Sequence, residues 1–174
     1  MTDMSSNISG YHYDHAGFNH SHSYLLPTVL RLLDGLNLPT SERRLFELGC
    51  GNGSVAHELS LRGWDITGID PSAEGITQAN RAYPDLKLYS GSAYDDLATH
   101  YGSFPVVLSL EVVEHVYFPR QYAATVFSLL QGGVQPFCPR PITATGKIWQ
   151  WPSVASSISI SQHCGIMATS NSGP

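Results

Sequence analysis

The sequence is poor in cysteine, in charged side chains and in long apolar runs, and each shortage excludes a class of protein. Its three cysteines, Cys50, Cys138 and Cys164, are odd in number and far apart, so they fit neither a disulfide framework nor a zinc motif, and we expect free thiols. Charged residues make up 13% of the chain, and the excess of acids gives a net charge of -5. This balance argues against nucleic acid as a partner.

Membrane segments are missing as well. No stretch is long and apolar enough to span a bilayer, and residues 1–10 lack a basic start followed by an apolar run. We therefore expect a cytoplasmic protein. With 174 residues, 42% of them hydrophobic, the chain is long enough to bury a core as one globular domain.

The most informative stretch is LFELGCGNG, residues 45–53, an apolar run that contains an acid and then breaks into alternating glycines. A helical pattern of apolar residues follows at once. This order is typical of a strand, a tight turn and a helix. Glycines in such a turn allow positive φ and let a ligand lie against bare backbone, so the stretch predicts a nucleotide-type binding site.

The spacing of the glycines distinguishes two families of such sites. The dinucleotide fingerprint is G-x-G-x-x-G, whereas this turn reads G-x-G-x-G with Glu47 two residues ahead. In this it resembles motif I of class I S-adenosylmethionine-dependent methyltransferases. The resemblance implies S-adenosylmethionine as methyl donor, with Glu47 bracing the turn. It implies that the methionyl part lies against Gly49, Cys50, Gly51 and Gly53.

A second strand is predicted over residues 64–70, and it ends in Asp70 just before Pro71. Both nucleotide families place an acid at this distance from the glycines, where a carboxylate can accept hydrogen bonds from both ribose hydroxyls. Pro71 is expected beside the same ligand. The alternative is that Asp70 caps the helix predicted over residues 72–83.

After a third strand, residues 86–89, comes the pair Ser92-Ala93. The methyltransferase resemblance implies that this pair reads the adenine edge, although the family commonly has an acid at its first position. A turn followed by a capped short helix at residues 95–97 explains the stretch equally well. Both interpretations stay open.

Residues 105–113, PVVLSLEVV, are apolar and β-branched, as expected of a parallel strand buried on both faces. The run E-x-x-E-H from Glu111 to His115 resembles the signature after the fourth strand of small-molecule methyltransferases of the ubiquinone-biosynthesis type. The resemblance implies that Leu110 and Glu111 lie by the methionine end of the cofactor and that the Glu-His pair opens the next helix. His115 could deprotonate an acceptor hydroxyl, or it could simply pack.

The N-terminal region holds a histidine cluster and a predicted helix. Imidazoles at short spacing are good metal ligands, but no acid or cysteine joins them at motif spacing, so no metal is predicted. By the methyltransferase resemblance, such a segment folds over the cofactor, which makes Tyr11, Tyr13 and His15 candidates for lid or acceptor contacts and His15 a second candidate base. Helices are predicted over 24–35, with Pro27 in the first turn, and over 119–130. The clustered histidines are His12, His15, His20 and His22.

Beyond Gly133 the family pattern stops, and the tail is rich in Ser, Pro and Ile. When the tail is back-translated with free codon choice and read from the third base of each codon, residues 138–150 can spell STPYHGYWKNLA and residues 161–173 can spell TALWDHGHIKFW. Both strings look like the missing continuation of the family, so we hypothesise a frameshift near Gly133. The alternative is a divergent natural tail. Without its usual neighbours, the fourth strand would become an exposed sheet edge.

The predicted fold class is therefore α/β, a doubly wound Rossmann-like methyltransferase sheet with strands 1 to 4 recognisable and the C-terminal strands missing or scrambled. We expect a lid over 1–23, a cofactor-binding core over 24–133 and an aberrant tail over 134–174. The expected activity is O-methylation of a small-molecule acceptor. The alternatives are an inactive, truncated methyltransferase that keeps a partial cofactor site, an NAD-dependent oxidoreductase and, last, a histidine-based metal protein.

Overall fold

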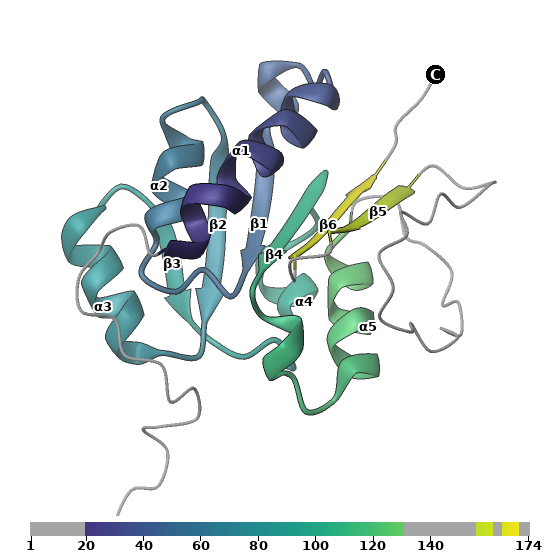
Figure 1. Ribbon diagram of the computed structural model, residues 1–174. Coiled ribbons are helices and arrows are strands. Elements are labelled where there is room, and N and C mark those ends of the chain that lie inside the picture. Colours follow the sequence, from purple (N-terminus) through teal and green to yellow (C-terminus); the bar gives the residue numbers. More distant parts are fainter. Residues whose placement is uncertain (1–19, 131–155, 162–164, 171–174) are drawn as a thin grey trace, which may run out of the picture.

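The computed structural model describes residues 20–130, 156–161 and 165–170, with the backbone alone for 20–24 and the two C-terminal ranges. These residues form a six-stranded sheet in the order β3-β2-β1-β4-β6-β5, with helices on both of its faces (Figure 1). The first four strands are parallel, and their order in space differs from their order in sequence. This is the doubly wound α/β arrangement, and the predicted fold class is confirmed.

The strands are β1 (Arg44–Leu48), β2 (Asp65–Asp70), β3 (Lys87–Ser90), β4 (Val106–Leu110), β5 (Ser156–Ser161) and β6 (Gly165–Ser170). The helices are α1 (His20–Gly35), α2 (Ser54–Ser60), α3 (Ala73–Ala82), α4 (Leu97–Tyr101) and α5 (Pro119–Leu129), with two one-turn 3-10 helices, η1 (Thr40–Glu42) and η2 (Val113–His115). Within the described ranges, no helix combines the length and the apolar composition that crossing a membrane requires.

Strands β1, β2 and β4 are buried on both faces: consecutive side chains point to opposite sides of the sheet, and nearly all of them are buried. The edge strand β3 is largely exposed. On one side, Leu45 and Ile66 pack with residues of α1, α2 and α3. On the other side, Phe46 and Val107 pack with residues of α4 and α5. The strand interiors are thereby filled with apolar side chains, so a ligand site belongs at the strand ends.

Helix α1 begins at His20, before the start predicted from the sequence, so Pro27 lies inside the helix and not in its first turn. The prediction was wrong because it took the first apolar residue of the pattern as the helix start. Leu25, Val29 and Leu33 form a buried stripe along the helix. Packing of this stripe against the sheet maintains the helix across a residue that has no N–H to donate.

The chain after β4 also differs from the prediction. The strand predicted over 105–113 ends at Leu110, and Glu111 takes a left-handed conformation with φ of 57°. The Glu-His pair expected to open the next helix lies in η2, and α5 begins only at Pro119. Because β-branched Val112 and Val113 continued the apolar pattern of the strand, the sequence did not reveal this break.

The sheet continues beyond β4, where the sequence predicted an exposed edge. Strand β6 pairs antiparallel with β4 along its length, from Val106 opposite Thr169 to Leu110 opposite Gly165, and β5 pairs antiparallel with β6. The prediction that β4 becomes an edge is therefore wrong. The tail has no βα alternation, but its run SSISIS alternates serine with β-branched isoleucine at the period of a strand, and GIMATS has the same length.

Candidate functional site

The turn between β1 and α2 is built on three glycines with positive φ: 87° at Gly49, 53° at Gly51 and 75° at Gly53. The amide of Gly49 donates a hydrogen bond of 2.8 Å to the carbonyl of Ile69 on β2. A Cβ on Gly49 would lie 2.3 Å from Cγ2 of Val112. Backbone conformation and close packing therefore both require glycine at this position, as predicted.

Asp70 ends β2 beside this turn and holds it in place. Its Oδ2 accepts a hydrogen bond of 2.9 Å from the amide of Gly51, and its Oδ1 accepts one of 2.8 Å from the amide of Ser72. The residue is 7% exposed. Burial raises the pKa of Asp70, while the bonds from Ser72 and Gly51 act in the opposite direction. Each carboxylate oxygen keeps a further lone pair for a ligand.

The helix that follows Asp70 is capped by a neighbouring residue and not by Asp70 itself. Ser72 is the N-cap of α3, and its Oγ accepts a hydrogen bond of 3.1 Å from the amide of Gly75. Asp70 supports that cap through the Ser72 amide, but it lies outside the helix. The carboxylate therefore ties the glycine turn to the start of α3, at the carboxyl ends of β1 and β2.

Glu47 lies in β1 under the same turn and is 2% exposed. Among the described residues, its Oε2 has no hydrogen-bond partner. Burial, and secondarily the charge of Asp70, raises the pKa of Glu47 to about 8. A buried carboxyl group without a partner is costly, so the position favours a ligand that can donate hydrogen bonds or carry positive charge.

Cys50 occupies the turn itself and is buried. Burial first, and then the charges of Glu47 and Asp70, raises the pKa of the Cys50 thiol well above its usual range. A thiol that stays protonated is a poor nucleophile, so Cys50 contributes shape and backbone to the turn and not covalent chemistry.

The loop after β3 contains the pair Ser92-Ala93. The Ser92 amide donates a hydrogen bond of 2.7 Å to Oδ2 of Asp95, and Ser92 Oγ accepts one of 3.2 Å from the amide of Tyr94. Asp96 then caps α4 through its Oδ1. The predicted turn and capped helix are therefore confirmed, while the predicted adenine contact of Ser92-Ala93 stays a prediction.

The end of β4 meets the glycine turn from the other side. Leu110 is the last residue of the strand and Glu111 follows in its left-handed conformation; both are half-buried. Val112 then packs so closely on Gly49 that no side chain fits between them. The segments after β1, β2 and β4 thus come together at one edge of the sheet, where doubly wound proteins bind their ligands.

Comparison with known proteins gives the family of the chain. A family model described as a methyltransferase domain matches residues 46–135, which is more than half of the chain. The chain belongs to the methyltransferase domain family. This confirms the resemblance to class I S-adenosylmethionine-dependent methyltransferases, and with it S-adenosylmethionine as the methyl donor of the family.

The curated relatives of this methyltransferase domain are longer proteins. It is similar to the ubiquinone biosynthesis O-methyltransferase of Psychrobacter cryohalolentis, with 32% identity over 97 residues that cover 52% of this chain and 38% of the relative. The enzyme of the same name from Cereibacter sphaeroides is 34% identical over 104 residues, covering 58% and 42%. The chain therefore spans about two fifths of the length of the curated relatives it matches.

A solved structure has a similar fold. The geranyl diphosphate C-methyltransferase of Streptomyces coelicolor, solved with Mg2+, geranyl diphosphate and S-adenosylhomocysteine, superposes with a TM-score of 0.51 at 16% identity. The match covers 63% of this chain and 43% of that protein. At this identity the similarity supports the fold of the methyltransferase domain and nothing finer.

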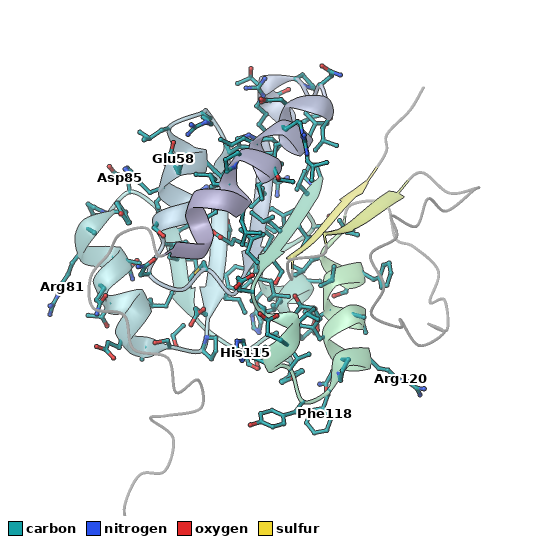
Figure 2. All side chains as sticks on the ribbon, viewed as in Figure 1. Glu58, Arg81, Asp85, His115, Phe118 and Arg120 are labelled. Atoms are coloured by element: carbon teal, nitrogen blue, oxygen red, sulfur yellow. The ribbon has the colours of Figure 1, made fainter. Side chains whose placement is uncertain are left out.

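The remaining predicted site residues of the methyltransferase domain are less tightly placed. His115 is exposed in η2, on the segment that joins β4 to α5 (Figure 2). Pro71 is exposed next to Asp70. Tyr11, Tyr13 and His15 lie outside the described residues, as do His12 and most of the predicted lid. No group of three or more metal-ligating side chains is found among the described residues.

Sequence reasoning missed two polar residues of this region. Tyr94 lies directly after Ser92-Ala93, and its hydroxyl oxygen accepts hydrogen bonds from the amides of Tyr117, at 2.9 Å, and Phe118, at 3.2 Å. Asn52 is buried in the glycine turn, where its Oδ1 accepts from the amide of Ser54 at 3.3 Å. An aromatic residue inside a polar turn was the available signal for Tyr94.

Proposed function

We propose that this methyltransferase domain binds S-adenosylmethionine at the turn after β1 and transfers the methyl group to an oxygen atom of a small-molecule acceptor. The observation that carries the proposal is the joint placement of Glu47, Asp70 and the glycine turn. Asp70 keeps a free lone pair on each oxygen for the ribose hydroxyls, and Glu47 has an oxygen without a partner in a buried site. These groups fit a cofactor that carries hydroxyls, an ammonium and a sulfonium.

We propose a role for each of the predicted contacts. The bare backbone of the turn would hold the methionyl part, with Glu47 beneath it, and Asp70 would accept from the ribose. Glu111 would lie by the amino-acid end, on the side where Val112 meets Gly49. The full set of proposed cofactor contacts is Glu47, Gly49, Cys50, Gly51, Gly53, Asp70, Pro71, Ser92, Ala93, Leu110 and Glu111.

The transfer itself asks little of the protein beyond positioning. When bound, S-adenosylmethionine would supply an electrophilic methyl group on sulfur, and the residues of the site would hold the acceptor oxygen in line with it. The acceptor must also lose its hydroxyl proton, and His115 or His15 would accept it. The walls of the site would orient the acceptor and exclude water. O-methylation is supported by the names of the curated relatives, which are O-methyltransferases.

Calorimetric titration with S-adenosylhomocysteine tests the cofactor site. We expect the Asp70→Ala variant to bind about tenfold more weakly or worse, because a hydrogen bond to a charged group contributes about 1.5–3 kcal/mol. Asp65→Ala is the matched control, since Asp65 begins the same strand and forms an exposed ion pair with Lys87. It should leave the affinity unchanged.

The same titration separates the two nucleotide-binding families. Thermal unfolding of each variant, measured alongside, shows whether the domain is still folded when binding is lost. Tight binding of NAD together with no binding of S-adenosylhomocysteine would refute the proposal and revive the oxidoreductase alternative.

A second candidate is a catalytically inactive chain that keeps a partial cofactor site. It is supported by the family match, which ends at residue 135 and leaves the following tail unmatched. Sequencing the gene tests the hypothesised frameshift: codons for residues 138–150 must encode the family string in the other frame. Transfer of labelled methyl to catechol, a phenolic probe, by an in-frame version but not by this chain would establish this candidate.

A further inference from the structure

Tyr94 connects the loop after β3 with the segment after β4. Its own amide donates to Oγ of Ser92 at 3.2 Å, which anchors it in the first loop. Its hydroxyl oxygen accepts from the amides of Tyr117 and Phe118, at 2.9 Å and 3.2 Å, and thereby reaches the second. Its ring packs edge-to-face on Phe118, with centroids 5.7 Å apart.

A further contact supports the same junction. Nε2 of Gln121, in the first turn of α5, donates a hydrogen bond of 3.4 Å to the carbonyl of Tyr94. One residue of the β3 loop therefore contacts the end of the β4–α5 segment through its hydroxyl, its ring and its backbone. The phenol oxygen has two lone pairs, and the two amides use both of them.

The segment that Tyr94 contacts packs on the core through Val112 and Val116, but most of its other side chains are exposed. Val113, Tyr117 and Phe118 are 41%, 81% and 63% exposed, and Figure 2 shows Phe118 on the outer end of the segment, away from the sheet. Its other backbone hydrogen bonds are local, such as His115 amide to the Val112 carbonyl at 2.9 Å. The far end of the segment, at Tyr117 and Phe118, buries little side-chain surface and therefore depends strongly on its tether to Tyr94.

We propose that Tyr94 is a positioning residue, which transmits the binding of the cofactor at Ser92-Ala93 to the segment that carries His115. This inference rests on the proposed function, because it requires a cofactor contact at the loop after β3. Ordering of that loop fixes the phenol oxygen, and the fixed oxygen then orders the Tyr117 and Phe118 amides. Cofactor binding would thus prepare the acceptor side of the site before the acceptor arrives.

Amide hydrogen exchange, measured by mass spectrometry with and without S-adenosylhomocysteine, tests the inference on the full chain. In the wild type, we expect the ligand to slow exchange in residues 91–95 and also in residues 113–118. The Tyr94→Phe variant keeps the ring and removes the phenol oxygen. We expect exchange at 113–118 to be about fivefold faster in it, as for loss of about 1 kcal/mol, and no longer sensitive to ligand.

A second tyrosine provides the control. Tyr89 is a half-exposed residue of β3 whose ring stacks on Tyr101, so Tyr89→Phe removes a hydroxyl near the same loop without touching the Tyr117 and Phe118 amides. It should behave as the wild type does. A purely structural role of Tyr94 would speed exchange at 113–118 in the variant but leave the ligand-dependent change intact.

The outcomes separate this inference from the proposed function. If the wild type binds S-adenosylhomocysteine and only residues 91–95 are protected, the positioning role of Tyr94 is wrong and the cofactor site stands. If the wild type shows no binding at all, the proposed function and this inference fail together. If Tyr94→Phe does not fold, a lack of ligand-dependent protection at residues 113–118 in the wild type still refutes the inference.

Discussion

The turn after β1 and the segment after β4 face the same edge of the sheet, yet they are held in opposite ways. The turn is buried, its glycines have positive φ, and Asp70 and the Ile69 carbonyl fix its backbone. The segment after β4 is largely exposed, and the Tyr94 hydroxyl and ring tether its far end. A buried turn that is fixed by its backbone thus lies next to a largely exposed segment that is tethered at its far end.

The largest expected effect is that of Gly49→Ala, which should disrupt the glycine turn after β1. The variant combines a side chain at a φ of 87° with a Cβ 2.3 Å from Val112. Left-handed strain and overpacking each cost about 1–3 kcal/mol, so we expect a loss of about 4 kcal/mol in the free energy of unfolding. Urea denaturation measures it.

A companion substitution divides that loss into its two causes. Val112→Ala in the same chain removes the methyl group that the new Cβ would strike. The double variant should therefore recover the overpacking part and retain the backbone strain. If Gly49→Ala alone costs less than about 1 kcal/mol, the turn is not rigid and the contrast with the β4 segment fails.

Glu47 offers a second test, through pH. Its folded pKa, about 8, lies above its ordinary value of 4.5, so between these values the folded state binds more protons than the unfolded state. The contribution of the protonated Glu47 to stability is therefore full below about pH 4.5 and is lost as the pH rises toward about 8. Asp70, whose pKa burial also raises, acts in the same direction.

We expect the wild type to lose on the order of 3 kcal/mol of unfolding free energy across this window. This is less than the full pKa shift implies, because water entry reduces the cost of burying the charge. The Glu47→Gln variant should lose much less, since an amide does not titrate. Glu58→Gln is the control: Glu58 pairs with Arg62 on the outside of α2 (Figure 2). If urea denaturation shows that the free energy of unfolding falls equally with pH in the wild type and in Glu47→Gln, the pH dependence does not come from Glu47.

The smallest expected effect is that of a substitution in the exposed segment after β4. Tyr117 is 81% exposed, so Tyr117→Ser should change the free energy of unfolding by no more than about 0.5 kcal/mol and leave the affinity for S-adenosylhomocysteine unchanged. Denaturation and titration of the same sample measure both quantities. A destabilisation above about 1 kcal/mol would show that the segment is packed more firmly than its exposure indicates.

The centre of the parallel sheet could be predicted from the sequence, because β1 and β4 have mostly apolar side chains that are buried on both faces. The edge strand β3, KLYS, is largely exposed and has no such apolar pattern. Asp70 could be predicted too, since its distance from the glycines is set by one βαβ unit. The left-handed Glu111 could not, because glutamate has no intrinsic preference for that conformation and tertiary packing imposes it.

Tyr94 and the β5–β6 hairpin escaped prediction for a related reason. The Tyr94 contacts join residues that are distant in sequence, and no local pattern announces them. The hairpin depends on the free edge of β4, a partner that periodicity within the tail cannot reveal. The hypothesis that the tail is read out of frame stays a prediction, which sequencing of the gene would test.

The antiparallel pairing of β6 with β4 also has a consequence for how the chain reaches its native state. The strands β5 and β6 are neighbours in sequence, so they can form a hairpin within microseconds, while docking on β4 must close a much longer loop. During synthesis, β4 leaves the ribosome well before β6 exists. We therefore expect a late folding step in which a preformed hairpin completes the sheet.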